Sequence, residues 1–154
     1  MLFRSFAAAL VGGADEASAV ALTDATVTDL AGGWYKVESD ITFDHTLNLL
    51  GDAHLTIADG ATMTVSSATA KGIDSDYTLT IDGAGALSVT ASGSYPIAVR
   101  VGSYVQTGAT VTANGYIGIR CMDNFDEFNV TNDFTFSGGQ LTATGSGEIG
   151  RAHV

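Results

Sequence analysis

Two short segments of the chain carry an arginine at the same position. They read Ile97-Ala-Val-Arg-Val101 and Ile117-Gly-Ile-Arg-Cys121. Both alternate in the manner of a strand, in which every second side chain points to the same face. Arg100 and Arg120 are therefore expected to point outward and to stack on each other if the two strands are neighbours.

Acidic residues accompany this pair. Asp74, in an earlier segment of the same type, extends the column, and Asp123 lies just beyond its end. Arg100, Arg120, Asp74 and Asp123 are thus the candidates for a catalytic group. The alternative, which we favour, is a structural role in which the arginines contact the aspartates and neutralise an acidic surface. We therefore assign no catalytic residue.

Other residue types that bind metals or catalyse reactions do not form a recognisable set. His45 and His54 lie on different predicted strands without a third ligand nearby, so neither a zinc site nor a Ser-His-Asp set can be assembled. Several aspartates offer the oxygen ligands that Ca²⁺ prefers. Most of them lie at predicted turns, where Asp bonds its own backbone. We predict no cofactor and keep Ca²⁺ as the alternative. These aspartates are Asp40, Asp44, Asp52, Asp59, Asp76 and Asp82.

Aromatic residues recur along the chain and suggest a second kind of site. An exposed row of aromatic rings would bind sugars by stacking. Several of these residues begin predicted strands, where an aromatic ring more often covers a corner or an end of the core. Both interpretations remain open. The residues are Trp34, Tyr35, Tyr77, Tyr95, Tyr104 and Tyr116.

Composition narrows the possible functions. The formal net charge is −11, which excludes binding to a phosphate backbone, because that affinity depends on Lys and Arg. No apolar run reaches the roughly 18 residues that a membrane span needs. The hydrophobic content of 45% is enough to build a core. The single cysteine, Cys121, cannot form an internal disulfide, and we expect it to be a small buried hydrophobic residue.

The elements that must position these residues are repeated strand pairs. The first is Ala53–Val65, in which two alternating strands flank a turn at Asp59-Gly60. The pattern returns in Tyr77–Thr90, in Tyr104–Ala113 and more loosely in Phe134–Thr144. A strand pair that recurs with its turn is typical of a stacked repeat. We take Gly60, Gly85, Gly108 and Gly139 as corresponding turn positions.

The fold class follows from the repeat. The Arg-containing segments supply a third strand to each cycle, so the chain predicts an all-β, right-handed parallel β-helix, or β-solenoid, of about four turns with three short strands each. Leu55, Ile57, Met63 and Val65 would point inward from one turn. The next turn would contribute Leu79, Ile81, Leu87 and Val89. A β-sandwich is the alternative, and the Asn114-Gly115 dipeptide, typical of a hairpin turn, favours it.

The two ends of the chain differ from its centre. Residues 1–5 and 148–154 match the translation of a sequencing adapter, so we interpret them as adapter-derived scars around an internal piece of a longer protein. Residues 6–33 are Ala-rich and form either an N-terminal cap or the remnant of a signal peptide. Residues 34–147 are assigned to the β-helix.

Three motifs carry a resemblance to a known class of proteins. They are Gly33-Trp-Tyr-Lys-Val, Asp40-Ile-Thr-Phe and the stretch from Asp52 to Val65. Over residues 32–114 the chain resembles the right-handed parallel β-helix regions of bacterial secreted or surface proteins, of adhesin-like and autotransporter-passenger-like type. The resemblance implies a secreted or cell-surface location and a rod-like scaffold, and it implies no activity.

The function expected from all this is that of a non-catalytic scaffold or adhesin-like segment. Its partners would be a polysaccharide or host glycan, or a second copy associating end to end through exposed solenoid ends. Two other classes remain open. The first is an enzyme, since the Arg100 and Arg120 column resembles in outline polysaccharide lyases that pair an arginine base with carboxylate-bound Ca²⁺. The second is a carbohydrate-binding module, which needs a coplanar row of exposed tyrosines.

Overall fold

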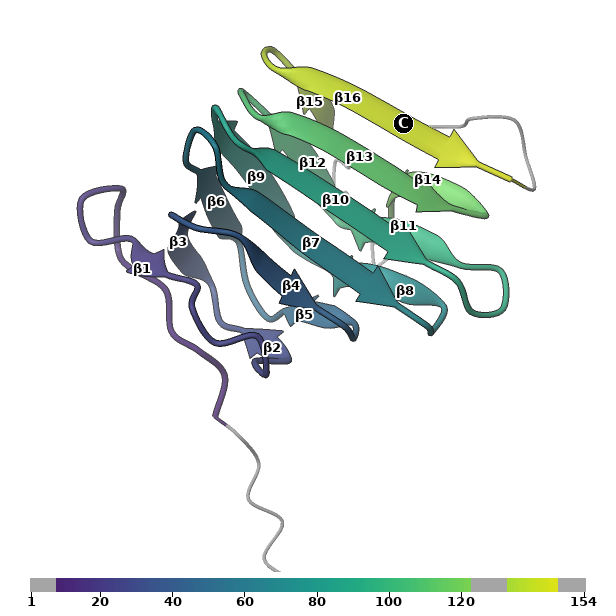
Figure 1. The fold of residues 1–154 in the computed structure, drawn as a ribbon, viewed down its shortest axis with the longest axis horizontal. Helices are drawn as coiled ribbons and strands as arrows, with labels where there is room; N and C mark the ends of the chain where they lie inside the picture. The colour runs from purple at the N-terminus through teal and green to yellow at the C-terminus, as the bar shows by residue number, and fades with distance from the viewer. Residues whose placement is uncertain (1–7, 123–132, 147–154) are drawn as a thin grey trace, which may run out of the picture.

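The chain winds through three parallel β-sheets that enclose a narrow interior (Figure 1). The computed structural model describes residues 8–122 and 133–146. Within these ranges the sixteen regular elements are all strands. Every pairing between strands of a sheet is parallel, and from β2 onward neighbouring strands of a sheet lie three elements apart in the chain.

We call the sheets A, B and C. Sheet A contains β2 (Asp29–Leu30), β5 (Leu47–Leu49), β8 (Lys71–Ser75), β11 (Ile97–Val101) and β14 (Ile117–Cys121). Sheet B contains β1 (Val20–Ala21), β3 (Gly33–Val37), β6 (Ala53–Ile57), β9 (Thr78–Gly83), β12 (Ser103–Gln106) and β15 (Phe134–Phe136). Sheet C contains β4 (Ile41–Phe43), β7 (Thr62–Ser67), β10 (Ala86–Ala91), β13 (Thr110–Gly115) and β16 (Gln140–Gly145).

The strand order B, C, A repeats four times in full, in β3–β5, β6–β8, β9–β11 and β12–β14. This confirms the β-solenoid of about four turns. It excludes the β-sandwich, because a sandwich is built from antiparallel strands. The Asn114-Gly115 dipeptide forms the end of β13 and not a hairpin turn.

The predicted turn equivalence was wrong by one residue at two of its four glycines. Register pairs align Thr62, Ala86, Thr110 and Gln140. Gly85 and Gly139 therefore immediately precede the first paired residue, whereas Gly60 and Gly108 precede it by two. The difference arises because a positive φ occurs at either position of the turn: at Gly60 (φ 79°) in one turn, and at Ala109 (φ 64°) and Gly139 (φ 80°) in others.

Alternation along the strands builds the core as predicted. All eight side chains expected to point inward from the second and third complete turns are between 0 and 1% exposed. Each contacts its equivalent one turn away, about 4.8 Å along the axis. One inward column runs through Ile41, Met63, Leu87 and Val111, for example. These columns form one continuous hydrophobic cluster.

Three polar residues of the described chain interrupt the inward columns, and each is hydrogen-bonded. Ser67 Oγ lies 2.8 Å from Thr69 Oγ1. Gln106 follows Leu55 and Ile81 in its column and is 0% exposed. It accepts a hydrogen bond from the Tyr104 hydroxyl (2.7 Å) and donates to the backbone oxygen of Gln140 (2.9 Å). Ser75 donates to the backbone oxygen of Leu49 (3.0 Å). Buried polar groups persist when they are satisfied in this way.

The N-terminal segment lies against the first turn. Strand β1 pairs with β3, β2 pairs with β5, and Leu10 forms an isolated bridge with Leu30. Gly12 and Gly33 approach so closely that a Cβ on Gly33 (φ 137°) would lie 2.8 Å from the Gly12 Cα. The Tyr35 hydroxyl donates to the backbone oxygen of Leu10 (2.8 Å). Residues 8–32 therefore cover the start of the solenoid.

Candidate functional site

Sheet A carries the predicted arginine column on its outer face. Register pairs join Arg100 to Arg120 on one side and to Asp74 on the other. The column continues from Asp74 through Asn48 to Asp29. The predicted stacking of Arg100, Arg120 and Asp74 is therefore confirmed. Asp123, the fourth candidate, lies outside the described residues.

Arg100 is held by two carboxylates from the preceding turn. Its Nη1 donates to Asp74 Oδ1 (3.0 Å) and to Asp76 Oδ1 (2.7 Å). Lys71 lies on the other side of Asp74, with its Nζ 3.5 Å from Oδ2. Only 15% of the Arg100 side chain is exposed, so this is a half-buried ion-pair network and not a surface pair.

The contacts of Arg100 oppose a role as a base. Burial lowers the pKa of its guanidinium, but hydrogen bonds to Asp76 and Asp74, and their charges, outweigh burial and raise that pKa above its ordinary value. A general base must lose its proton near the operating pH. The arrangement therefore favours Arg100 as a permanent cation that joins two turns.

Arg120 occupies the next position of the column, on β14. Within residues 8–122 and 133–146 no hydrogen bond or ion pair of its side chain is found. The column thus ends in two adjacent cations, of which only Arg100 has carboxylate partners in the described ranges. A surface hollow of about 500 Å³ lies along the column, and its lining includes Asp29, Asn48, Asp74, Asp76 and Arg100.

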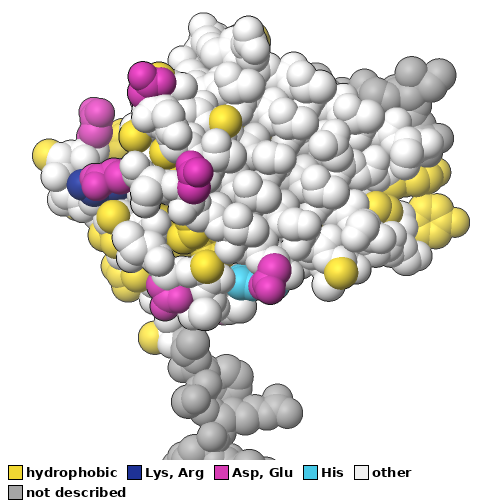
Figure 2. All heavy atoms as spheres, in the orientation of Figure 1, with side chains coloured by type: hydrophobic (Ala, Val, Ile, Leu, Met, Phe, Trp, Pro, Cys, Tyr) yellow, Lys and Arg dark blue, Asp and Glu magenta, His cyan; other side chains and the backbone are white. Residues whose placement is uncertain are grey.

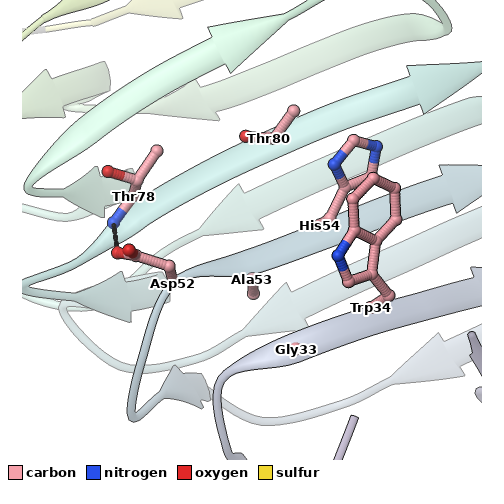
Figure 3. A pocket seen from close by; sticks show the side chains of 7 residues that line it. All are labelled: Gly33, Trp34, Asp52, Ala53, His54, Thr78 and Thr80. Carbon is pink, nitrogen blue, oxygen red and sulfur yellow. Dashed lines mark hydrogen bonds between the residues drawn. The ribbon is translucent and has the colours of Figure 1, made fainter. Parts of the chain in front are cut away.

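Sheet B carries an aromatic stack that the sequence did not reveal. Trp34 and His54 are register partners, and their rings stack at 3.7 Å with an interplanar angle of 14° (Figure 3). The two rings flank a hollow of about 270 Å³ that Asp52 and Thr78 also line. The sequence did contain a signal for this stack, because Trp34 and His54 each occupy the second position of their strand, after Gly33 and Ala53.

His54 is the most unusual titratable group in this stack. Its Nε2 is buried without a hydrogen-bond partner in the described part of the chain, and Asp82 Oδ2 lies 3.9 Å away, beyond hydrogen-bonding distance. Burial lowers the pKa of the imidazole, while the charges of Asp82 and Glu16 act in the opposite direction. The second histidine, His45, lies between β4 and β5, and its Nε2 is 2.7 Å from the Val27 backbone oxygen.

Five of the six aspartates considered as Ca²⁺ ligands have polar contacts within the described chain. Asp40 accepts from the Thr62 backbone N–H (2.8 Å), and Asp52 accepts from that of Thr78 (3.0 Å). Asp82 accepts from the N–H of Gly83 (2.7 Å). Among the described residues, no three His, Cys, Asp or Glu side chains come close enough to hold a metal ion.

The tyrosines do not form a coplanar row. Tyr35 and Tyr104 are 0% exposed and belong to the core. Tyr95 is 71% exposed, but its ring meets that of Tyr116 at 83°, edge to face. Tyr77 lies apart, between β8 and β9. For Tyr35 and Tyr104 the core interpretation is therefore confirmed, and the described tyrosines do not form the exposed row that was its alternative.

Cys121 is half-buried, not fully buried, at the end of β14, where it packs against the core. Burial raises the pKa of its thiol, and a backbone hydrogen bond from Tyr104 only partly opposes this. A raised pKa leaves little thiolate at neutral pH, which makes the group unreactive.

The outer face of sheet C carries neither charges nor aromatic rings. Figure 2, in the orientation that presents this sheet, shows no charged side chain over β7, β10 and β13. Its outward side chains form three columns, which together we call the threonine face. They are Thr62, Ala86, Thr110 and Gln140; Thr42, Thr64, Ser88, Thr112 and Thr142; and Ser66, Thr90, Asn114 and Thr144.

Comparison with protein-family models, with curated proteins and with solved structures gives no significant match to the chain. The described residues include no helix with the length and apolar character of a membrane span.

Proposed function

We propose that this chain is a segment of a β-solenoid scaffold in a secreted or bacterial cell-surface protein, with no catalysis in this segment. The observation that supports it best is the state of the arginine column. The strongest catalytic candidate, Arg100, is committed to Asp74 and Asp76 of the neighbouring turn. Such a contact stabilises the stack and leaves the guanidinium unsuited to proton transfer.

The surface chemistry agrees with a passive extracellular role. A net charge of −11 on a rigid rod limits non-specific association and keeps the protein apart from nucleic acid. In-register parallel pairing leaves little of the backbone open to proteases, since both neighbours of each central strand bond it. Adhesin-like behaviour, toward a polysaccharide or host glycan, would use the outer faces of the sheets.

A second element of the proposal is end-to-end association. Among the described residues, β14, β15 and β16 each end their sheet, with one edge unpaired by any other strand. Unpaired strand edges of this kind are templates for pairing with another chain. We infer that solenoid ends pair between copies, and sedimentation over a range of protein concentrations would measure this. A strictly monomeric protein would contradict it.

Activity assays separate the scaffold from the enzyme. The full chain is incubated with polygalacturonate and other acidic polysaccharides, with and without Ca²⁺, and unsaturated products are followed by absorbance. The scaffold proposal predicts no cleavage. Cleavage that disappears in both Arg100→Lys and Arg120→Lys would establish the lyase-like alternative instead.

Location needs its own measurement. Antibodies raised against the chain are applied to intact bacteria that express the complete gene. Labelling that is removed when protease is added to the intact cells is the expected result. Labelling only after the cells are broken would overturn the proposed location.

A further inference from the structure

The threonine face is chemically unlike the rest of the surface. It comprises thirteen side chains, of which eight are threonine and two are serine. None is charged, although the chain as a whole carries 17 acidic residues. The acidic side chains that reach this side of the molecule lie at its margins (Figure 2). A neutral ligand that presents many hydrogen-bonding groups is complementary to such a face.

The hydroxyl groups of the threonine face are available to a ligand. In the described part of the chain, none of the ten donates or accepts a hydrogen bond within the protein. Some hydroxyls at other positions bond within the protein. Thr46 bonds Thr69 (2.7 Å) and the Lys71 backbone oxygen (2.7 Å), and Ser75 bonds the Leu49 backbone oxygen (3.0 Å). Free hydroxyls also occur on sheet B, for example at Thr56 and Thr80, but there they do not form a column. The central column of the threonine face carries one on each of five successive strands of sheet C.

The face is also regular in two directions. Because β7, β10, β13 and β16 pair in register without a bulge, equivalent side chains repeat about every 4.8 Å across the strands. Outward side chains two residues apart, such as Thr62 and Thr64, repeat about every 6.6 Å along a strand. The eight threonines among the thirteen positions each offer a hydroxyl beside a methyl group. The strands that carry these positions run side by side (Figure 1).

We propose that the threonine face binds ice. The spacing across the strands is close to the shortest oxygen repeat on the basal and prism faces of hexagonal ice, and the spacing along a strand is somewhat shorter than the second repeat of the prism face. The hydroxyls would occupy lattice positions of water, and the intervening methyl groups would order the water between the columns. The inference rests on the proposed scaffold role, which needs no active site and supplies a rigid, in-register surface.

The composition of the face favours ice over a polysaccharide surface. Sugar rings are bound by stacking on aromatic side chains, and the threonine face has none. Of the exposed tyrosines, Tyr77 lies in the connection β8–β9. Tyr95, edge to face with Tyr116, lies beyond the ends of β10 and β13, at the margin of the threonine face and not among its columns. Crystalline cellulose and chitin are therefore the competing ligands in the experiment, and not part of the proposal.

The experiment measures thermal hysteresis and inhibition of ice recrystallisation by the full chain. Thr64→Lys together with Thr112→Lys places two long charged side chains in the central column and is expected to abolish both activities. The matched control is Thr56→Lys with Thr80→Lys, at outward positions of neighbouring strands of sheet B. This control is expected to retain both activities, and circular dichroism verifies that both proteins are folded.

A gain-of-function variant keeps the proposal testable if the lysine variant fails to fold. Ala86→Thr with Ser88→Thr places threonine at the β10 positions of two columns and is expected to increase thermal hysteresis at equal protein concentration. Absence of ice activity in the unmodified chain, or equal loss in the sheet B control, would overturn the proposal. So would sedimentation with microcrystalline cellulose or chitin that Thr64→Lys with Thr112→Lys abolishes. None of these results bears on polysaccharide cleavage, which tests the scaffold role separately.

Discussion

Arg100 on β11 donates a hydrogen bond to Asp74 on β8, its register partner one turn earlier, at 3.0 Å. Arg120, the register partner on the other side, has no such contact in the described ranges. Two residues that are equivalent in the sequence repeat thus differ in structure. The difference lies in the neighbouring turn, which supplies carboxylates to one arginine and a second cation to the other.

Arg100→Ala is expected to lower the free energy of unfolding by about 1–3 kcal/mol, because it removes the cation shared by the partly buried Asp74 and by Asp76. Arg120→Ala, at the matched position, should change it by less than about 0.5 kcal/mol. Urea denaturation followed by circular dichroism measures both. Equal effects of the two substitutions would contradict the assignment of Arg100 as the bridging residue.

The interior pair Tyr104 and Gln106 gives a second prediction. Each single substitution, Tyr104→Phe or Gln106→Leu, leaves a buried polar group without its partner and should cost about 1–3 kcal/mol. The double variant should cost less than the sum of the two, because the hydroxyl and the amide are removed together. A double-mutant cycle in urea measures the coupling. Strict additivity would show that the 2.7 Å hydrogen bond contributes nothing specific.

Much of the fold could be predicted because each strand obeys a period of two. That rule alone places Leu55, Ile57, Met63 and Val65 inside, and the structure confirms it. The same rule, applied without exception, also turns Tyr35 and Tyr104 inward. The alternative of an exposed aromatic row grouped residues by type before assigning each of them to a face, which is why it included these two buried rings.

The contacts of the candidate site were less accessible from the sequence. The stacking of Arg100, Arg120 and Asp74 follows from their equal offsets in the repeat. The contact between Asp76 and Arg100 does not follow from the repeat, because Asp76 lies outside the strands, in the connection between β8 and β9. The hydrogen bond from Gln106 to the Gln140 backbone joins residues 34 positions apart, and depends on a register that a single turn does not reveal.

Substitutions at two glycines separate the cost of a strained backbone conformation from the cost of a steric clash of the added Cβ. Gly60 has φ 79°, and a Cβ placed there meets no atom within 4 Å. Gly60→Ala should therefore cost only the left-handed backbone penalty, about 1 kcal/mol. Gly83 has φ 100°, and a Cβ there collides with the Ile57 carbonyl oxygen. Gly83→Ala should cost more than about 3 kcal/mol, since paired backbone must move. Thermal unfolding of the two variants measures the difference, and a Gly60→Ala cost as large as that of Gly83→Ala would refute the distinction.

The Trp34–His54 stack should make stability depend on pH. Burial disfavours the charged imidazole and lowers the pKa of His54 in the folded protein. As the pH falls below the ordinary histidine value of about 6.5, the unfolded chain takes up a proton that the folded chain resists. The free energy of unfolding should therefore decrease toward acid pH, and His54→Gln should remove this part of the slope. Asp82→Asn should steepen it, because the Asp82 charge opposes the effect of burial. Urea titrations between pH 7 and pH 5 measure the slopes. An unchanged slope in His54→Gln would mean that the buried ring titrates as it does in the unfolded chain.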